Sequence, residues 1–264
     1  MGSATRDALT AVRETLVQQG GAADLGVAEE LFSLARLLGS SAQLRGAVAD
    51  PAADPAEKAA LVQRAFAGKV SGAALAALTT AARQRWSEPA DIIDGLEEAG
   101  VRAIAQSAPA SVSISDELFE VGRAVASDAQ LELALRSKLA DPAAKVGVVE
   151  RLLQTKVSAQ TVAIVRQLVA DPRGRGIRES LRWAQQTVAD QKQAVLATVT
   201  SAQPLTAAQL DRLRGVLSKR YDKAIAFNTV IDPELIGGLR VRVGDDVIDS
   251  SIATRLSDVR LQLA

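Results

Sequence analysis

Side chains capable of chemistry are scarce in this chain. Its 264 residues include no cysteine and no histidine, which removes thiolate nucleophiles, imidazole acid–base catalysis and nearly all zinc sites. Carboxylate, lysine, serine and tyrosine groups remain. They form no Ser–Lys or paired-carboxylate arrangement of the convergent kind that an active site needs. The sequence therefore predicts a noncatalytic protein with no cofactor and no metal.

A carboxylate cluster near the end of the chain is the strongest candidate for a metal site. Asp245, Asp246 and Asp249 lie within five residues of one another, but they match no recognised ligand spacing. Gly244-Asp245 stands between two alternating segments, a pattern typical of a hairpin turn. Asp249, followed by two serines, suits a helix start. These features favour a structural role for the three aspartates over metal binding.

Two other segments are candidates for anion binding, and both are better explained as loops or turns. Gly237-Gly238 lacks the surroundings of a phosphate loop and precedes a strand pattern instead of a helix, so it indicates a chain reversal. Residues 173–178 read RGRGIR, and a charge run this short favours a solvated loop between helices over an anion site. Trp86 and Trp183 suit either an interface or a core, and the sequence leaves that choice open.

Charge and hydropathy exclude further classes. Lysine and arginine total 31, and aspartate and glutamate also total 31, so the chain carries no electrostatic signature of nucleic-acid or anionic-membrane binding. No segment approaches the roughly 18 uncharged apolar residues of a membrane span. The amino terminus has no apolar run, so we expect no signal peptide. A protein without direct membrane insertion is predicted.

The chain contains an internal duplication. Residues 30–71 align without a gap with residues 117–158, at an offset of 87 residues, and 19 of the 42 positions are identical. Charged, aromatic and proline positions match, including Phe32 with Phe119 and Asp54-Pro55 with Asp141-Pro142. The two phenylalanines lie on an apolar helical face, so we expect both in the core. Alanine bias cannot produce such matches. A repeat of this length indicates a duplicated domain.

Helical periodicity dominates both copies. Apolar residues recur at helical spacing, and the two Asp-Pro pairs each predict a helix start. We expect helices over Thr5–Gln19, Val27–Leu38, Ala42–Val48, Ala73–Arg85, Pro89–Gln106, Gln160–Ala170 and Ile177–Lys192, and one from Pro55. The fold class is therefore mainly α. We expect one helical bundle at 1–106, a second at 111–193 and a small α/β domain at 194–264.

The last seventy residues have a different pattern. Short β-branched or alternating segments at 194–200, 224–231, 239–243 and 246–249 predict strands. An amphipathic helix is expected from Thr206, and a last one bears Ile252, Leu256, Val259 and Leu263. The predicted order is βαβββα.

One string in this region is distinctive. It runs from Asp232 to Ser251, and a Val199–Leu205 segment of the form V-x-S-A-x-P-L precedes it. Its characteristic positions are Asp232, Leu235, Gly237, Gly238, Val241, Gly244, Asp245, Val247, Asp249 and Ser251. The string resembles the carboxy-terminal signature of the ATP synthase delta subunit family, also called the oligomycin-sensitivity conferral protein family. The resemblance covers about residues 113–264. The extra amino-terminal copy is a departure that we associate with actinobacterial members.

The resemblance implies a noncatalytic stator subunit of a hetero-oligomeric F-type ATP synthase at the cytoplasmic face of the cell membrane. The helical domain of such a subunit binds alpha-subunit amino termini of the alpha–beta catalytic head, and its terminal domain holds the stalk b subunit. Two bundles suggest two such contacts. Expected partner contacts are Leu31, Leu118, Arg123, Trp183, Ile252, Leu256 and Val259. The alternative is a free-standing helical-repeat adaptor.

Overall fold

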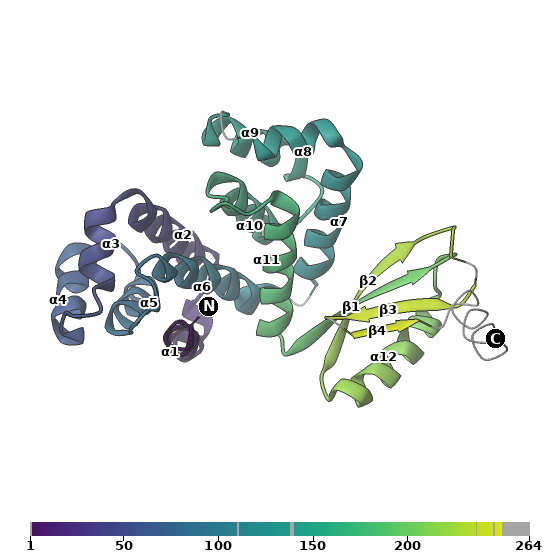
Figure 1. Cartoon of the computed structure of the whole chain (residues 1–264), viewed down its shortest axis with the longest axis horizontal. Helices are drawn as coiled ribbons and strands as arrows, with labels where there is room; N and C mark the ends of the chain where they lie inside the picture. Colours follow the sequence, from purple (N-terminus) through teal and green to yellow (C-terminus); the bar gives the residue numbers. More distant parts are fainter. Residues whose placement is uncertain (1, 110, 138–139, 236, 245, 250–264) are drawn as a thin grey trace, which may run out of the picture. The chain divides into compact units, whose positions relative to one another are not determined.

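The computed structural model describes residues 2–109, 111–137, 140–235, 237–244 and 246–249 (Figure 1). Its contacts divide the chain into two compact units, residues 1–188 and residues 189–264. The first unit is helical, and the second combines a mixed sheet with a helix. The predicted fold class, mainly α with a small α/β domain, is confirmed. The finer division at 106, 111 and 193 stays a prediction.

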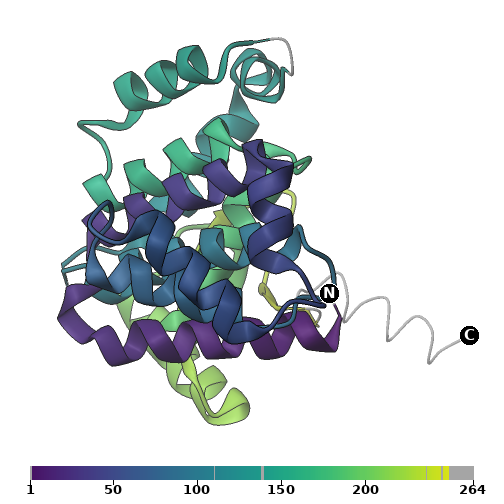
Figure 2. The ribbon, with the colours of Figure 1, turned by 90° about the vertical axis from the view of Figure 1, so that its left-hand side faces the viewer.

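The helices of the two copies repeat at the predicted offset. The second helix of the chain, α2 (Leu25–Ser40), corresponds to α7 (Ile114–Ser127). The next three pairs have bounds that differ by 87 residues throughout: α3 (Ala42–Ala49) with α8 (Ala129–Arg136), α4 (Pro55–Phe66) with α9 (Pro142–Leu153), and α5 (Gly72–Arg83) with α10 (Ala159–Ala170). Helix α1 (Ser3–Gln19) begins the first copy, ahead of its aligned segment, and α11 (Ile177–Gln191) closes the second. Figure 2 shows the first-copy helices, coloured purple to blue, from the side.

The predicted Asp-Pro helix starts are confirmed in both copies. The Asp54 carboxylate accepts the backbone N–H of Ala56 at 2.7 Å, and the Asp141 carboxylate accepts that of Ala143 at 3.3 Å. Each aspartate thus satisfies a free donor of the first turn, while the following proline occupies a position that needs none.

Helix α6 (Asp91–Ser107) is buried on every face. Every residue from 92 to 105 is buried except Asp94, the pattern of a helix surrounded by others. Two glycines permit close contact: a Cβ on Gly95 would lie 2.4 Å from the Trp86 ring, and one on Gly100 would lie 2.4 Å from the Phe32 ring. A single apolar cluster, running from Ala8 to Val188, includes residues of both copies.

The aromatic residues differ between the copies. Trp86 is 4% exposed and its indole N–H donates to the Ala81 carbonyl at 2.8 Å, so it is a core residue. Phe32 is buried, as expected. Phe119 was expected to be buried as well, but it is only half-buried, so that expectation is wrong.

The second unit contains a sheet of order β2-β1-β3-β4. Its strands are β1 (Ala194–Ser201), β2 (Ala224–Ile231), β3 (Leu239–Val243) and β4 (Asp246–Asp249). Strand β1 pairs in parallel with β2 through the crossover helix α12 (Ala207–Tyr221) and antiparallel with β3. Thr206 and Gln209 form the capping box that begins α12. The expected last helix lies outside the described residues.

Candidate partner-binding surfaces

Charged side chains join the two helical copies. On the first copy they come from α2 and α6, and on the second from α10 and the loop that follows it. Arg36 of α2 donates to the Gln167 side chain of α10, and Arg166 of α10 pairs with Glu29 of α2. The copies therefore meet through matched polar groups as well as through the shared apolar cluster.

The centre of this contact is Glu97. Its side chain is fully buried in α6 and forms an ion pair with Arg175 from the loop of the second copy. The Gln167 amide lies 3.5 Å from its other oxygen. Burial raises the pKa of the Glu97 carboxyl, while the positive charge and hydrogen bond of Arg175 act in the opposite direction. This carboxylate depends on the second copy for its ionic partner.

A second ion pair lies one helical turn away. Arg173 Nη1 is 3.1 Å from Asp94 Oδ1. Burial raises the pKa of the Asp94 carboxyl, and the nearby Arg173 opposes that rise. Burial likewise lowers the pKa of Arg36, with a contribution from the like charge of Arg166. Desolvation thus shifts the pKa of Glu97, Asp94 and Arg36, which all lie at the contact between the copies.

The loop at 173–178 was expected to be solvated, and that expectation is wrong for its first two arginines. The side chains of Arg173 and Arg175 are only 15% and 20% exposed, because the acids of α6 hold them. Left-handed backbone at Arg173 (φ 51°) and Gly174 (φ 78°) turns the chain between α10 and α11. Arg178 does remain on the surface, paired with Glu132 at 3.2 Å.

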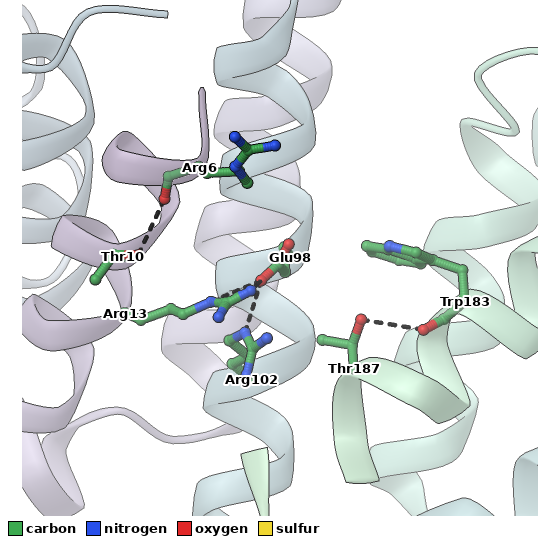
Figure 3. A network of polar contacts seen from close by, with 7 residues as sticks. All are labelled: Arg6, Thr10, Arg13, Glu98, Arg102, Trp183 and Thr187. Carbon is green, nitrogen blue, oxygen red and sulfur yellow. Dashed lines mark hydrogen bonds and ion pairs between the residues drawn. The ribbon is translucent and has the colours of Figure 1, made fainter. Parts of the chain in front are cut away.

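Trp183, a predicted partner contact, lies beside this network. The Arg175 guanidinium stacks over its ring at 4.6 Å, a favourable cation–π arrangement. Figure 3 shows Trp183 near Thr187, whose hydroxyl donates to the Trp183 carbonyl at 3.0 Å. The indole is half-buried. The structure shows the Trp183 ring covered by Arg175, and partner contact by Trp183 stays a prediction.

A separate charged group ties α1 to α6. Arg13 donates to Glu98 Oε1 through Nε at 3.0 Å and Nη2 at 2.7 Å, and Arg102 donates to the same oxygen at 2.7 Å (Figure 3). In the same view the Thr10 hydroxyl donates to the Arg6 carbonyl at 3.0 Å. Buried Glu98 is therefore compensated within the first copy, unlike Glu97.

The remaining predicted contacts fall into three groups. Leu31 and Leu118 are 0% and 1% exposed, which gives both a packing role, and partner contact by them stays a prediction. Arg123 lies on the surface of α7, 60% exposed and 3.1 Å from Glu120. Ile252, Leu256 and Val259 lie outside the described residues.

The signature residues build turns and core of the second unit. The Asp232 backbone N–H donates to the Ser201 carbonyl at 2.9 Å, and its carboxylate accepts the Glu234 N–H at 3.1 Å. Gly237, Gly238 and Gly244 have φ of 66°, 74° and 59°, values that favour glycine. Leu235 and Val241 are buried. The glycine pair therefore sits in a chain reversal, as expected.

Asp249 ends the described part of this motif. Its carboxylate accepts the Arg240 Nε at 3.0 Å across the β3–β4 pair. Asp245 and Ser251 lie outside the described residues. Among the side chains that the structure does place, no group of three His, Cys, Asp or Glu residues is arranged to hold a metal ion.

The contact between the copies escaped prediction from the sequence. Glu97 stands 78 residues before Arg175 and Glu29 stands 137 residues before Arg166, so no local spacing links the acids to the arginines. One signal was present: Asp94, Glu97 and Glu98 interrupt an otherwise apolar segment of α6. Acids at that place require buried cationic partners, although the sequence does not identify them.

Comparisons with known proteins give the family. The model of the family "ATP synthase delta (OSCP) subunit" matches residues 100–263. The ATP synthase subunit delta of Leifsonia xyli is 52% identical over 264 residues, with both chains fully covered. That of Streptomyces coelicolor is 38% identical, with 100% of this chain and 98% of the other covered. The chain therefore belongs to the ATP synthase delta (OSCP) subunit family.

A match among solved structures, from the Toxoplasma gondii mitochondrial ATP synthase hexamer, has a TM-score of 0.36 at 20% identity and covers 62% of this chain and 94% of that one. A likeness this low adds nothing to the assignment. The family match begins within α6 and so leaves most of the first copy outside it. Among the described helices, none combines the length and apolarity needed to cross a membrane.

Proposed function

We propose that this protein is a noncatalytic stator subunit of an F-type ATP synthase, located peripherally at the cytoplasmic face of the bacterial cell membrane. It joins the alpha-subunit amino termini of the catalytic head to the stalk b subunit and so resists rotor torque. Full-length similarity to delta subunits carries this proposal. The scarcity of chemically active side chains supports a noncatalytic role.

The structure supports a load-bearing role in physical terms. A torque-resisting link requires extensive packing, and one apolar cluster runs through both helical copies. The ion pair of buried Glu97 with Arg175 adds a directional contact between the copies that fixes their register, and the more exposed pair of Asp94 with Arg173 adds a second. Grooves between alanine-rich helices accept a further amphipathic helix by ridge-and-groove packing.

The decisive experiment is recovery of partners from detergent-solubilised membranes with this chain as bait and mass spectrometry as readout. Joint recovery of alpha, beta and b subunits is expected. Recovery of other proteins without any synthase subunit would contradict the proposal and favour the free-standing adaptor. Nucleotide turnover by the isolated chain would contradict the noncatalytic assignment.

A further inference from the structure

Three helices recur at the interval of the duplication. Helices α1, α6 and α11 begin at Ser3, Asp91 and Ile177, 88 and 86 residues apart, which is close to the repeat offset of 87. The four helices between α1 and α6 correspond one by one to the four between α6 and α11. Two separate copies would each need a first and a last helix, but in the described chain α6 alone stands between the two sets of four.

The middle helix of the three is buried on every face, whereas the outer two each expose a polar face. Arg6 and Glu14 of α1 are exposed, and the residues 87 positions later, Ile93 and Val101 of α6, are apolar and buried. The exposed residues of α11 include Arg178, Glu179, Arg182, Gln186 and Asp190. A polar outer face is typical of the end units of a repeat array, and burial all round is typical of an internal unit. The pattern therefore gives α6 neighbours from both copies.

Helix α1 opens the first copy by contacting α5 and the loop after it. The Thr15 hydroxyl donates to the Thr80 hydroxyl of α5 at 3.0 Å. The Thr5 hydroxyl accepts the backbone N–H of Ser87, in the loop between α5 and α6, at 3.0 Å. The opening helix of a copy is thus held by the helix that precedes the closing one and by the loop between those two.

Helix α6 makes the same kind of contact with the second copy. The Gln167 amide of α10, the counterpart of Thr80, donates to the Glu97 carboxylate at 3.5 Å. Arg175, in the loop between α10 and α11, forms an ion pair with the same carboxylate. The family match also begins within α6, at residue 100, and not after it. Toward the second copy, α6 therefore takes the place that α1 takes toward the first.

We infer that α6 is a structural member of both copies, closing the first bundle and opening the second. The first bundle then consists of α1 to α6 and the second of α6 to α11, so the second begins at Asp91 instead of the predicted residue 111. A shared helix leaves no linker between the bundles. They form one rigid body that unfolds cooperatively, because a hinge motion between them would have to break α6. This inference rests on the repeat geometry and is independent of the proposed function.

Hydrogen exchange of the full chain, followed by mass spectrometry, tests the inference at one repeat position. Val62 of α4 and Val149 of α9 stand 87 residues apart, and both are buried. Helix α4 packs on α5 as α9 packs on α10, so Val62→Ala weakens the first copy and Val149→Ala the second. We expect each variant to speed exchange of the α6 amides by about tenfold or more. Leu217→Ala, at a buried position of α12 in the sheet unit, is the control and should leave α6 exchange unchanged.

The outcomes separate a shared helix from a helix of the first copy alone. If α6 exchange does not respond to Val149→Ala, α6 belongs to the first copy and the inference fails. A response to Leu217→Ala equal to the other two would overturn it as well, because cooperativity would then extend over the whole chain.

The wild type gives a second reading that needs no core variant. As urea is added, the slowest amides of α4, α6 and α9 should converge on one free energy of opening. Convergence of α4 with α6, while α9 opens separately at a lower free energy, would contradict the inference.

Discussion

The carboxylate of Glu117 accepts hydrogen bonds from both the backbone N–H and the hydroxyl of Ser158, at 3.1 and 2.5 Å. The first copy repeats the contact: Glu30 accepts from the N–H and hydroxyl of Ser71 at 3.0 and 2.5 Å. Ser71 caps the start of α5 and Ser158 caps the start of α10. Glu30 and Glu117 therefore also lie at the positive end of a helix dipole. The duplication thus retains a side chain that fixes one helix start against another helix.

Replacing this acid should destabilise the helical unit. Glu117→Ala removes a charged acceptor and leaves the Ser158 N–H and hydroxyl without it, so we expect a loss of about 1.5–3 kcal/mol in the free energy of unfolding. Glu30→Ala should have a similar effect in the first copy. Urea denaturation followed by circular dichroism measures both. Glu120→Ala, on the exposed side of the same helix, is the control and should change stability by less than about 1 kcal/mol.

The buried Glu97 makes stability depend on pH. Burial raises its folded-state pKa above the ordinary value of 4.5, so the folded protein holds this proton more tightly than the unfolded chain. The contribution of Glu97 to the free energy of unfolding is therefore fully present below about pH 4.5 and declines as pH rises through the folded-state pKa. Glu97→Gln does not ionise and escapes this decline.

The measurement compares unfolding free energies of wild type and Glu97→Gln between about pH 4 and about pH 8. The wild-type value minus the variant value should fall steadily with pH. Glu14→Gln, at an exposed position of α1, controls for the removal of one negative charge. A difference that is constant or rises with pH would show that burial does not dominate the pKa shift of Glu97.

Removing Arg175 should lower the free energy of unfolding, because Glu97 loses the positive charge that compensates its burial. Arg175→Ala leaves the Glu97 carboxylate buried without its principal ionic partner, and loss of one member of a buried pair costs about 3–5 kcal/mol. It also exposes the Trp183 ring that the guanidinium covers. We expect lower urea resistance together with red-shifted tryptophan emission.

A double-mutant cycle tests the assignment to this pair. Glu97→Gln combined with Arg175→Ala should cost clearly less than the sum of the two single changes, because the uncompensated charge disappears. Additive losses would mean that the two side chains are not energetically coupled. Arg178→Ala, which affects only a surface pair with Glu132, supplies a matched arginine control.

Local chemistry was predictable from the sequence, and long-range pairing was not. The Asp54-Pro55 and Asp141-Pro142 helix starts follow from side-chain and ring properties that act within four residues. The glycines at 237 and 238 follow from backbone conformations that other residues rarely adopt. The Arg175–Glu97 pair instead depends on how two complete bundles pack, which no spacing within either bundle encodes.

The half-burial of Phe119 has the same origin. It shares its repeat position with Phe32, so sequence alone predicts the same environment for both. Phe32 is buried against Gly100 of α6, a helix enclosed by both copies. Equivalent positions therefore diverge in exposure although their residue types agree.

Gly100 should tolerate no side chain. A Cβ there would lie 2.4 and 2.7 Å from two carbons of the Phe32 ring, inside a buried helix where neither partner has room to move. Gly100→Ala gains helix propensity but must displace the ring, so we expect a net loss of about 1–3 kcal/mol in the free energy of unfolding. Thermal and urea unfolding measure the effect. Gly46→Ala, at an exposed position of α3 with no atom within 4 Å of the added carbon, should instead gain about 0.5–1 kcal/mol. Equal gains at both positions would mean that α2 and α6 do not approach as closely as Phe32 and Gly100 indicate.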